Sequence, residues 1–215
     1  PRLSIRLKAG LISNVITLTN SKNPITVKRK SFSSKAIQIV ELINQKVILA
    51  IIPNSYKLVE KKENISIEYF NIEKQGTINI QKQEILSGKV SLSEAEIIVS
   101  GGRGLKGPEN WRMIEELAGI LGAATACSKP VSDIGWRPHS EHVGQTGKAV
   151  APNLYIAIGI SGAIQHLAGV NSSKLMVVIN TDPEAPFFKA ADYGIVGDAF
   201  EVVPKMIEAI KNLNR

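Results

Sequence analysis

Several residue types and segments are rare or missing in this sequence of 215 residues. Cys127 is the single cysteine, which excludes an intramolecular disulfide and favours a reducing compartment. Aromatic residues make up 5% of the chain and do not alternate with Lys and Arg as in RNA-binding proteins, so nucleic acid is not an expected partner. No run of about 18 uninterrupted apolar residues occurs, so we expect no insertion into a membrane.

Basic residues and glycine are unevenly distributed along the chain. Residues 1–90 contain 15 Lys and Arg against 6 Asp and Glu, whereas residues 91–215 contain 11 against 13. Only 3 of the 17 glycines precede residue 91. This difference predicts two domains, 1–88 and 89–215, with a linker at Ser87–Ser93. The basic excess of the first domain is typical of a solvated surface or a docking face.

Residues 1–88 are rich in Ile, Val, Thr, Ser and Asn, which predicts a β-rich domain. We expect strands at four places: Ile25–Lys28, Ala36–Leu42, Lys46–Ile52 and Ile65–Tyr69. Ile37 and Ile39 alternate with polar residues, as in a half-buried sheet. The chain starts at Pro1 with sheet-like apolar residues and without a start or signal pattern, so we expect the first part of this domain to be absent.

Residues 89–215 alternate between short apolar runs and amphipathic segments. We expect five strands, at Ala95–Ser100, Ala123–Cys127, Leu154–Ile158, Lys174–Asn180 and Gly194–Val196. Helices are expected between and after them, at Pro108–Leu121, Ile160–Leu167, Pro186–Ala191 and Phe200–Leu213. This alternation predicts an α/β fold of Rossmann-like type, with a parallel sheet flanked by helices. Ligands of such sheets bind at the carboxyl ends of the strands.

Two polar turns surround the apolar run Leu154–Ile158, within the stretch Val143–Gly169. The first turn offers Gln145, Thr146 and Lys148, and the second offers Ser161, Gln165 and His166. If a helix starts at Ile160, its first N–H groups are free to meet an anion. Two donor-rich turns beside a buried strand predict a site for a large cofactor that carries phosphate.

Two common nucleotide-binding motifs fit this chain poorly. Gly102–Gly107 matches G-x-G-x-x-G, but the next strand ends at Cys127-Ser128-Lys129 without the carboxylate that holds the ribose of NAD. The glycine turn still allows backbone N–H groups and Arg103 to approach a phosphate. Gly144–Lys148 resembles the end of a Walker A loop, but Ala149 replaces the Ser or Thr that binds magnesium.

Two further groups of potentially reactive side chains are not expected to form a functional site. His139, Glu141 and His142 do not have the spacing of H-E-x-x-H, so a metal site is not expected. Cys127 at the end of a strand is expected to be a small core residue.

Five motifs carry a family resemblance: Ser100–Leu105, Val143–Lys148, Leu154–Gly169, Asn180–Pro186 and Ala191–Val196. Together, and in this order, they resemble the alpha subunit of electron transfer flavoprotein over residues 94–210. Residues 1–86 resemble only the later part of that subunit's N-terminal domain. Several long motifs in register are far more specific than any single glycine turn.

The resemblance implies an electron carrier rather than an enzyme with its own substrate. It implies a heterodimer with the electron transfer flavoprotein beta subunit and a bound FAD. Such carriers take electrons from dehydrogenases, such as the acyl-CoA dehydrogenases of fatty acid beta-oxidation, and pass them to a membrane quinone oxidoreductase. The implied compartment is the bacterial cytoplasm or the mitochondrial matrix.

The resemblance also implies sixteen FAD-binding residues: Arg103, Ser128, Lys129, Val143, Gly144, Gln145, Thr146, Ser161, Gly162, Ala163, Ile164, Gln165, His166, Asn180, Asp198 and Ala199. Val143–Thr146 are implied to lie along the isoalloxazine, and Ser161–His166 near the pyrophosphate and the carbonyl edge of the ring. Asn180, Asp198 and Ala199 are implied to hold the adenosine part. Lys129 stands where the family has Arg, which keeps the positive charge but loses the planar fork of donors.

Two alternatives remain open. One is a nicotinamide-dependent oxidoreductase domain, which the missing ribose carboxylate disfavours. The other is an interaction fragment that binds no cofactor.

Overall fold

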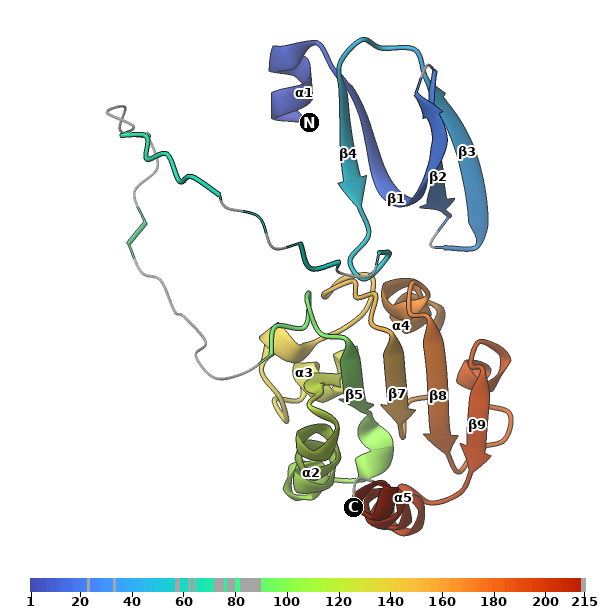
Figure 1. Cartoon of the computed structure of the whole chain (residues 1–215). Helices are drawn as coiled ribbons and strands as arrows, with labels where there is room; N and C mark the ends of the chain where they lie inside the picture. Colours follow the sequence, from blue (N-terminus) through green and yellow to red (C-terminus); the bar gives the residue numbers. More distant parts are fainter. Residues whose placement is uncertain are drawn as a thin grey trace.

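The computed structural model describes residues 1–22, 24–32, 34–56, 59–61, 63, 65–71, 76, 80–81 and 90–213, with the backbone alone for residues 19–22. It contains two sheets, one on each side of residue 90 (Figure 1). The boundary predicted between residues 88 and 89 and part of the linker Ser87–Ser93 lie outside the described residues. The boundary therefore stays a prediction.

The described elements of the first region are one helix and four strands: α1 (Arg2–Leu7), β1 (Gly10–Lys22), β2 (Ile25–Ser31), β3 (Ala36–Leu42) and β4 (Val47–Ile51). The strand order is β3-β2-β1-β4, with β1 and β4 parallel and the other pairs antiparallel. Among its described side chains, those buried in the core are Ile12, Val15, Val27 and Leu42. A core of this size covers little of the sheet.

Two predictions for this region are wrong. Ile65–Tyr69 is not a strand, and Ile65 and Tyr69 are 82% and 91% exposed. High β propensity forms a strand only beside a pairing partner, and none of the described residues pairs with this segment. Ile37 and Ile39 are not half-buried, because they pair with Lys30 and Lys28 on the sheet face opposite Val27.

The second region is an α/β domain, as predicted. Its strands are β5 (Ile97–Gly101), β6 (Ala124–Cys127), β7 (Leu154–Ile158), β8 (Leu175–Asn180) and β9 (Tyr193–Val196). Its α-helices are α2 (Arg112–Leu121), α3 (Lys129–Asp133), α4 (Ile164–Val170) and α5 (Ala199–Leu213), with short 3-10 helices at Arg103–Leu105, Pro108–Trp111, His139–Glu141 and Pro186–Lys189. The strands are all parallel, in the order β6-β5-β7-β8-β9.

Both faces of this sheet are covered. Alternate residues of the strands point to opposite faces, so Val99 and Ile156 pack with α2 and α5, which lie side by side in Figure 1. Tyr155 packs with α4 and with Phe187 on the other face. Burial on both faces explains why the strands are continuous apolar runs.

Three helices begin later or run shorter than predicted. In the first, predicted at Pro108–Leu121, a 3-10 turn at Pro108–Trp111 precedes α2. The expected helix at Ile160 begins at Ile164, because Gly159 and Gly162 have left-handed φ angles of 63° and 85°. These angles are incompatible with an α-helix. The expected helix Pro186–Ala191 is a single 3-10 turn at Pro186–Lys189.

Hydrogen bonds between described residues join the two regions. Asn54 Nδ2 donates to the carbonyl oxygens of Ala151 at 2.9 Å and Ala95 at 3.4 Å. Lys30 Nζ donates to the Asn171 carbonyl at 3.4 Å, and the hydroxyls of Ser34 and Ser172 lie 2.9 Å apart. Among the described residues, no helix has the length and apolar character needed to cross a membrane.

Candidate functional site

The chain order of the C-terminal sheet reverses at β5, which has β6 on one side and β7 on the other. The turns after β5 and β7 therefore meet at this point. Gly102 N donates to the Ile158 carbonyl at 2.9 Å, and Gly104 N donates to the Gly159 carbonyl at 3.0 Å. A Cβ atom on Gly102 would lie 2.1 Å from the Gly159 oxygen, so only glycine fits there. Such a switch point is where open α/β sheets bind ligands.

A cavity of about 530 Å³ lies at the carboxyl ends of the strands. Its wall contains residues from the turns after β5, β6 and β7 and from the end of β8. Twelve of the sixteen predicted residues line it: Arg103, Ser128, Lys129, Val143, Gly144, Gln145, Thr146, Ser161, Ala163, Gln165, His166 and Asn180. Segments that are far apart in the sequence thus form one wall.

Five further lining residues were not predicted: Gly104, Pro130, His142, Gly159 and Ile160. Each adjoins a predicted residue or its neighbour in the chain, so their signal was their position in the same turns. His142 was considered only as a metal ligand, although its imidazole is 1% exposed and belongs to the cavity wall.

Four predicted residues do not line the cavity. Gly162 is buried against Phe187, and the side chain of Ile164 is 73% exposed. Asp198 caps α5, because its Oδ1 accepts a hydrogen bond from Phe200 N at 3.0 Å, and its Oδ2 pairs with Lys106 at 3.2 Å. Ala199 is the first residue of α5 and is buried in the core. Their contact with a cofactor stays a prediction.

The cavity wall is suited to an anion. Its charged side chains are Arg103 and Lys129, and it includes no Asp or Glu. Among the described residues, neither cation has an ion-pair partner in the structure. Both side chains are exposed and can therefore turn toward phosphate oxygens.

The two polar turns that the sequence singled out are bonded to each other. Gln145 N donates to the Gln165 carbonyl at 2.7 Å. A Cβ atom on Gly169 would lie 2.5 Å from Gly144 Cα, so the first turn packs directly on α4. Asn180 fixes the second turn, because its Nδ2 donates to the Ile160 carbonyl at 3.0 Å. The wall is thus held by backbone contacts before any ligand binds.

His166 has an unusual environment. Its side chain is 7% exposed, and its Nε2 lies 3.0 Å from the hydroxyl of Tyr155. Burial, together with a smaller effect of the neighbouring His142, lowers the pKa of His166 from 6.5 to about 4, and the Val143 backbone partly opposes this. At neutral pH the ring is therefore uncharged. Its Nδ1 is buried without a hydrogen bond to any described residue.

The residues weighed as metal ligands have other partners. Glu141 accepts two hydrogen bonds from Arg137, at 2.8 Å and 2.7 Å. His139 and His142 contact each other with ring centroids 5.2 Å apart. No group of three His, Cys, Asp or Glu side chains in the described part could hold a metal ion. Cys127 is a core residue, as predicted, and burial raises the pKa of its thiol to about 12.

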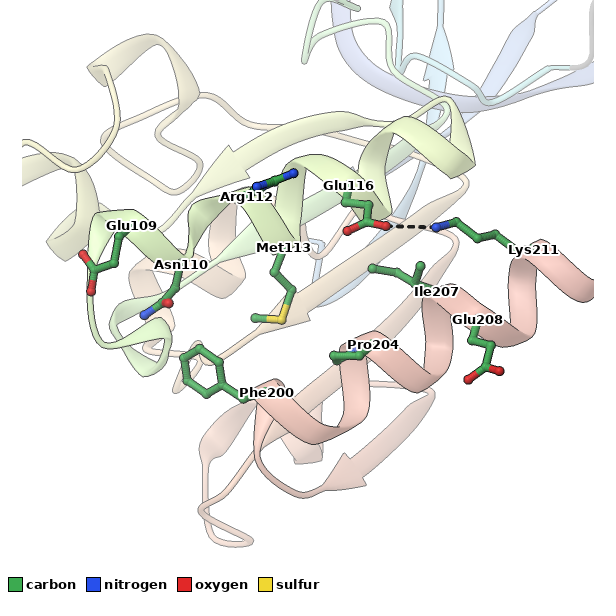
Figure 2. A pocket seen from close by; sticks show the side chains of 10 residues that line it. All are labelled: Glu109, Asn110, Arg112, Met113, Glu116, Phe200, Pro204, Ile207, Glu208 and Lys211. Atoms are coloured by element: carbon green, nitrogen blue, oxygen red, sulfur yellow. Dashed lines mark hydrogen bonds and ion pairs between the residues drawn. The ribbon is translucent and has the colours of Figure 1, made fainter.

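A second hollow of about 570 Å³ lies between α2 and α5, on the outer surface of the domain (Figure 2). Figure 2 shows the ion pair between Glu116 and Lys211 that closes one side of it, with nitrogen and oxygen 3.0 Å apart. None of the sixteen predicted residues lines this groove. The candidate site is therefore the cavity at the carboxyl ends.

The cavity wall fits FAD. The two cations and the backbone N–H groups of glycine turns suit a pyrophosphate, and the unsatisfied Nδ1 of His166 suits a ring carbonyl. NAD binding in the usual way requires a carboxylate that holds the ribose, and the cavity lining contains none.

Comparison with known proteins gives the same cofactor. Residues 91–171 match the electron transfer flavoprotein FAD-binding domain, which confirms FAD as the cofactor. The chain is 44% identical over 218 residues to the electron transfer flavoprotein subunit alpha of Bacillus subtilis, covering 100% of this chain and 67% of that protein. The Paracoccus denitrificans subunit alpha is 41% identical over 96% of this chain and 67% of its own length.

A mitochondrial relative matches over a shorter span. The mitochondrial subunit alpha of Dictyostelium discoideum is 57% identical over 125 residues, which is 58% of this chain and 35% of that protein. The chain spans about two thirds of the length of its bacterial relatives. By its identity and coverage, the chain belongs to the electron transfer flavoprotein alpha subunit family.

Proposed function

We propose that this chain is the FAD-holding alpha subunit of an electron transfer flavoprotein and works as a heterodimer with a beta subunit. FAD, when bound, accepts and releases electrons one at a time. The chain's own residues bind FAD, orient it and set its reduction potential. The observation that carries this proposal is the cavity at the carboxyl ends of the strands, whose lining contains two cations, no carboxylate and twelve of the residues that the family resemblance assigned.

Nine of the sixteen residues are proposed to act on different parts of FAD, according to their chemistry. Arg103 and Ser161 hold the pyrophosphate, while Gln145 and Thr146 offer polar side chains to the isoalloxazine. Lys129 provides a positive charge that stabilises the reduced, anionic ring. His166 donates to the ring's carbonyl edge, and Asn180, Asp198 and Ala199 hold the adenosine part.

We further propose that dehydrogenases, among them acyl-CoA dehydrogenases, donate electrons to the heterodimer and that a membrane quinone oxidoreductase accepts them. The mitochondrial name of one relative supports the matrix as the site of action in a eukaryote, and the bacterial names support the cytoplasm. In this role the protein is a carrier and has no substrate turnover of its own.

Co-expression with the beta subunit, followed by a visible spectrum and a reductive titration, tests the proposal. We expect a yellow complex that takes up electrons in two separate one-electron steps. A complex that is colourless after incubation with FAD and removal of the unbound FAD would overturn the proposal and leave the interaction fragment. Binding of NADH in calorimetry, with no binding of FAD, would support the nicotinamide alternative.

Variants of the two cations locate FAD in the cavity. We expect Arg103→Ala to weaken FAD binding about 10-fold, the usual effect of losing one charged hydrogen bond. Arg112→Ala is the matched control, because Arg112 lines the groove between α2 and α5 instead. Lys129→Ala should lower the reduction potential of the bound flavin. Unchanged potentials would contradict the role given to Lys129.

A further inference from the structure

Three aromatic rings pack together behind the cavity wall. Tyr155 on β7 is 0% exposed and stacks on Phe187, with ring planes 10° apart and centroids 6.4 Å apart. His166 on α4 contacts the same Phe187 ring at 5.9 Å between centroids. The Tyr155 hydroxyl lies 3.0 Å from His166 Nε2. Of these three residues, His166 alone lines the cavity.

The hydrogen bond between Tyr155 and His166 can run in two directions. Burial raises the pKa of the Tyr155 hydroxyl well above its ordinary value, with Ser100 opposing the rise, so the phenol keeps its proton. The imidazole of His166 is neutral at pH 7, as its low pKa shows, and carries one proton. Either the phenol donates to a bare Nε2, with the ring proton on Nδ1, or Nε2–H donates to the phenol oxygen.

The acidities of the two groups favour the first arrangement. A phenol O–H is a stronger acid than the N–H of a neutral imidazole, so it is the better hydrogen-bond donor of the pair. A ring nitrogen that accepts a hydrogen bond carries no proton, so a phenol that donates across the 3.0 Å to Nε2 leaves the ring proton on Nδ1.

We propose that Tyr155 is a positioning residue for His166: its hydroxyl donates to Nε2, keeps the imidazole proton on Nδ1, and makes His166 a neutral hydrogen-bond donor toward the cavity. The Nδ1–H makes no hydrogen bond within the described part of the protein. A buried donor without a partner is unfavourable, so a ligand carbonyl that reaches it is bound more tightly. This inference rests on the proposed function for the identity of that carbonyl, which is on the flavin ring.

The protonation of His166 in the unmodified chain tests the inference directly. The chain has three histidines, so ¹⁵N-labelled histidine gives few signals, and His166→Gln identifies the relevant one by its loss. Nitrogen shifts distinguish a protonated ring nitrogen from a bare one. We expect Nδ1 protonated and Nε2 bare at pH 7. A protonated Nε2 would overturn the inference without any variant having to fold.

Removing the hydroxyl gives a second readout. In Tyr155→Phe, Nε2 loses a donor that favours the neutral ring, so the pKa of His166 should rise by about one unit. A fall in that pKa would mean that Tyr155 accepts the bond and would overturn the proposal. Tyr193→Phe is the matched control, because Tyr193 lies on β9, is 65% exposed and does not line the cavity. His142 is the other titratable group acting on His166, and its signal reports any general disturbance.

The flavin readout separates the two proposals. In the complex with the beta subunit, Tyr155→Phe should weaken FAD binding several-fold and lower the reduction potential of the bound flavin, whereas Tyr193→Phe should change neither. If the ring proton lies on Nδ1 but the unmodified complex binds no FAD, the proposed function fails while the role of Tyr155 stands. If the unmodified complex binds FAD but the ring proton lies on Nε2, the proposed function stands while the role of Tyr155 fails.

Discussion

The two sheets of this protein differ in how completely they are covered. The C-terminal sheet has one buried cluster on each face, with fourteen residues in each, whereas the described side chains of the N-terminal sheet form one cluster of four. The described N-terminal region leaves Ile37, Ile39 and Ile43 at least 64% exposed. Hydrophobic burial is the main stabilising term in folding, so the C-terminal region should be the more stable of the two.

The comparison shows where a binding site can be built. At the carboxyl ends of the C-terminal strands, turns cross at backbone distance, and the packed layers on either side prevent them from moving apart. In the part of the chain that the structure describes, the N-terminal sheet has only one small buried cluster to support such turns. A site that must hold a cofactor in one orientation therefore belongs to the region covered on both faces.

The largest effect is expected from a substitution where the turns after β5 and β7 cross. In Gly102→Ala, the new Cβ would lie 2.1 Å from the Gly159 carbonyl oxygen, and neither backbone can move without disturbing β5 or β7. We expect a loss of about 3 kcal/mol of unfolding free energy and loss of FAD binding. Gly119→Ala on α2, where nothing lies within 4 Å of the new atom, should be neutral or slightly stabilising. Equal unfolding free energies of the two variants in denaturant titrations would contradict this explanation.

Acid should affect the C-terminal region selectively. All three histidines lie there, and the folded pKa of His166 is about 4 against an ordinary value of 6.5. Between these values the unfolded chain binds the extra proton, so stability is complete above pH 6.5 and falls as the pH drops toward 4. The loss from His166 is about 3 kcal/mol at most. Unfolding titrations at several pH values should show that the unfolding free energy of His166→Gln falls less steeply between pH 6.5 and pH 4 than that of the unmodified chain. An equally steep fall would show that His166 does not cause the acid sensitivity.

Much of the C-terminal region could be predicted because its signals are local. An apolar run such as Leu154–Ile158 between glycines specifies a buried strand, and parallel strands bring their carboxyl ends to one edge. Twelve predicted residues therefore meet in one cavity. The start of α4 was misjudged, because the left-handed angles of Gly159 and Gly162 are not visible in an apolar periodicity.

The N-terminal region was less predictable because sheet pairing is not a local property. We predicted no element in residues 1–22, yet β1 pairs with both β2 and β4 at the centre of the sheet. The exposed segment Ile65–Tyr69 has the composition of a strand and forms none. Composition indicates which segments can pair, and only the tertiary structure decides which do.

A matched pair of core substitutions separates the two regions. Val99→Ala and Val15→Ala each remove two methyl groups from a side chain that is 0% exposed. Each should cost about 2 kcal/mol locally. Hydrogen exchange should show Val15→Ala exposing only the amides of β1–β4, while Val99→Ala lowers global stability and FAD affinity. If Val15→Ala destabilised the C-terminal strands equally, the two regions would unfold as one unit and the comparison would be wrong.

The smallest effect tests whether charge, rather than burial, explains the difference between the regions. The ion pairs of the C-terminal region include Glu116 with Lys211, which links α2 to α5, but both side chains are about half exposed. Solvent and salt screen such pairs, so Lys211→Ala should change the unfolding free energy by no more than about 0.5 kcal/mol. Lys174→Ala removes a charge at an exposed position that forms no ion pair with a described residue, so it is the matched control. If Lys211→Ala instead lowered the unfolding free energy about as much as Val99→Ala does, and 1 M salt abolished this difference from the unmodified chain, ion pairs between helices would stabilise the C-terminal region.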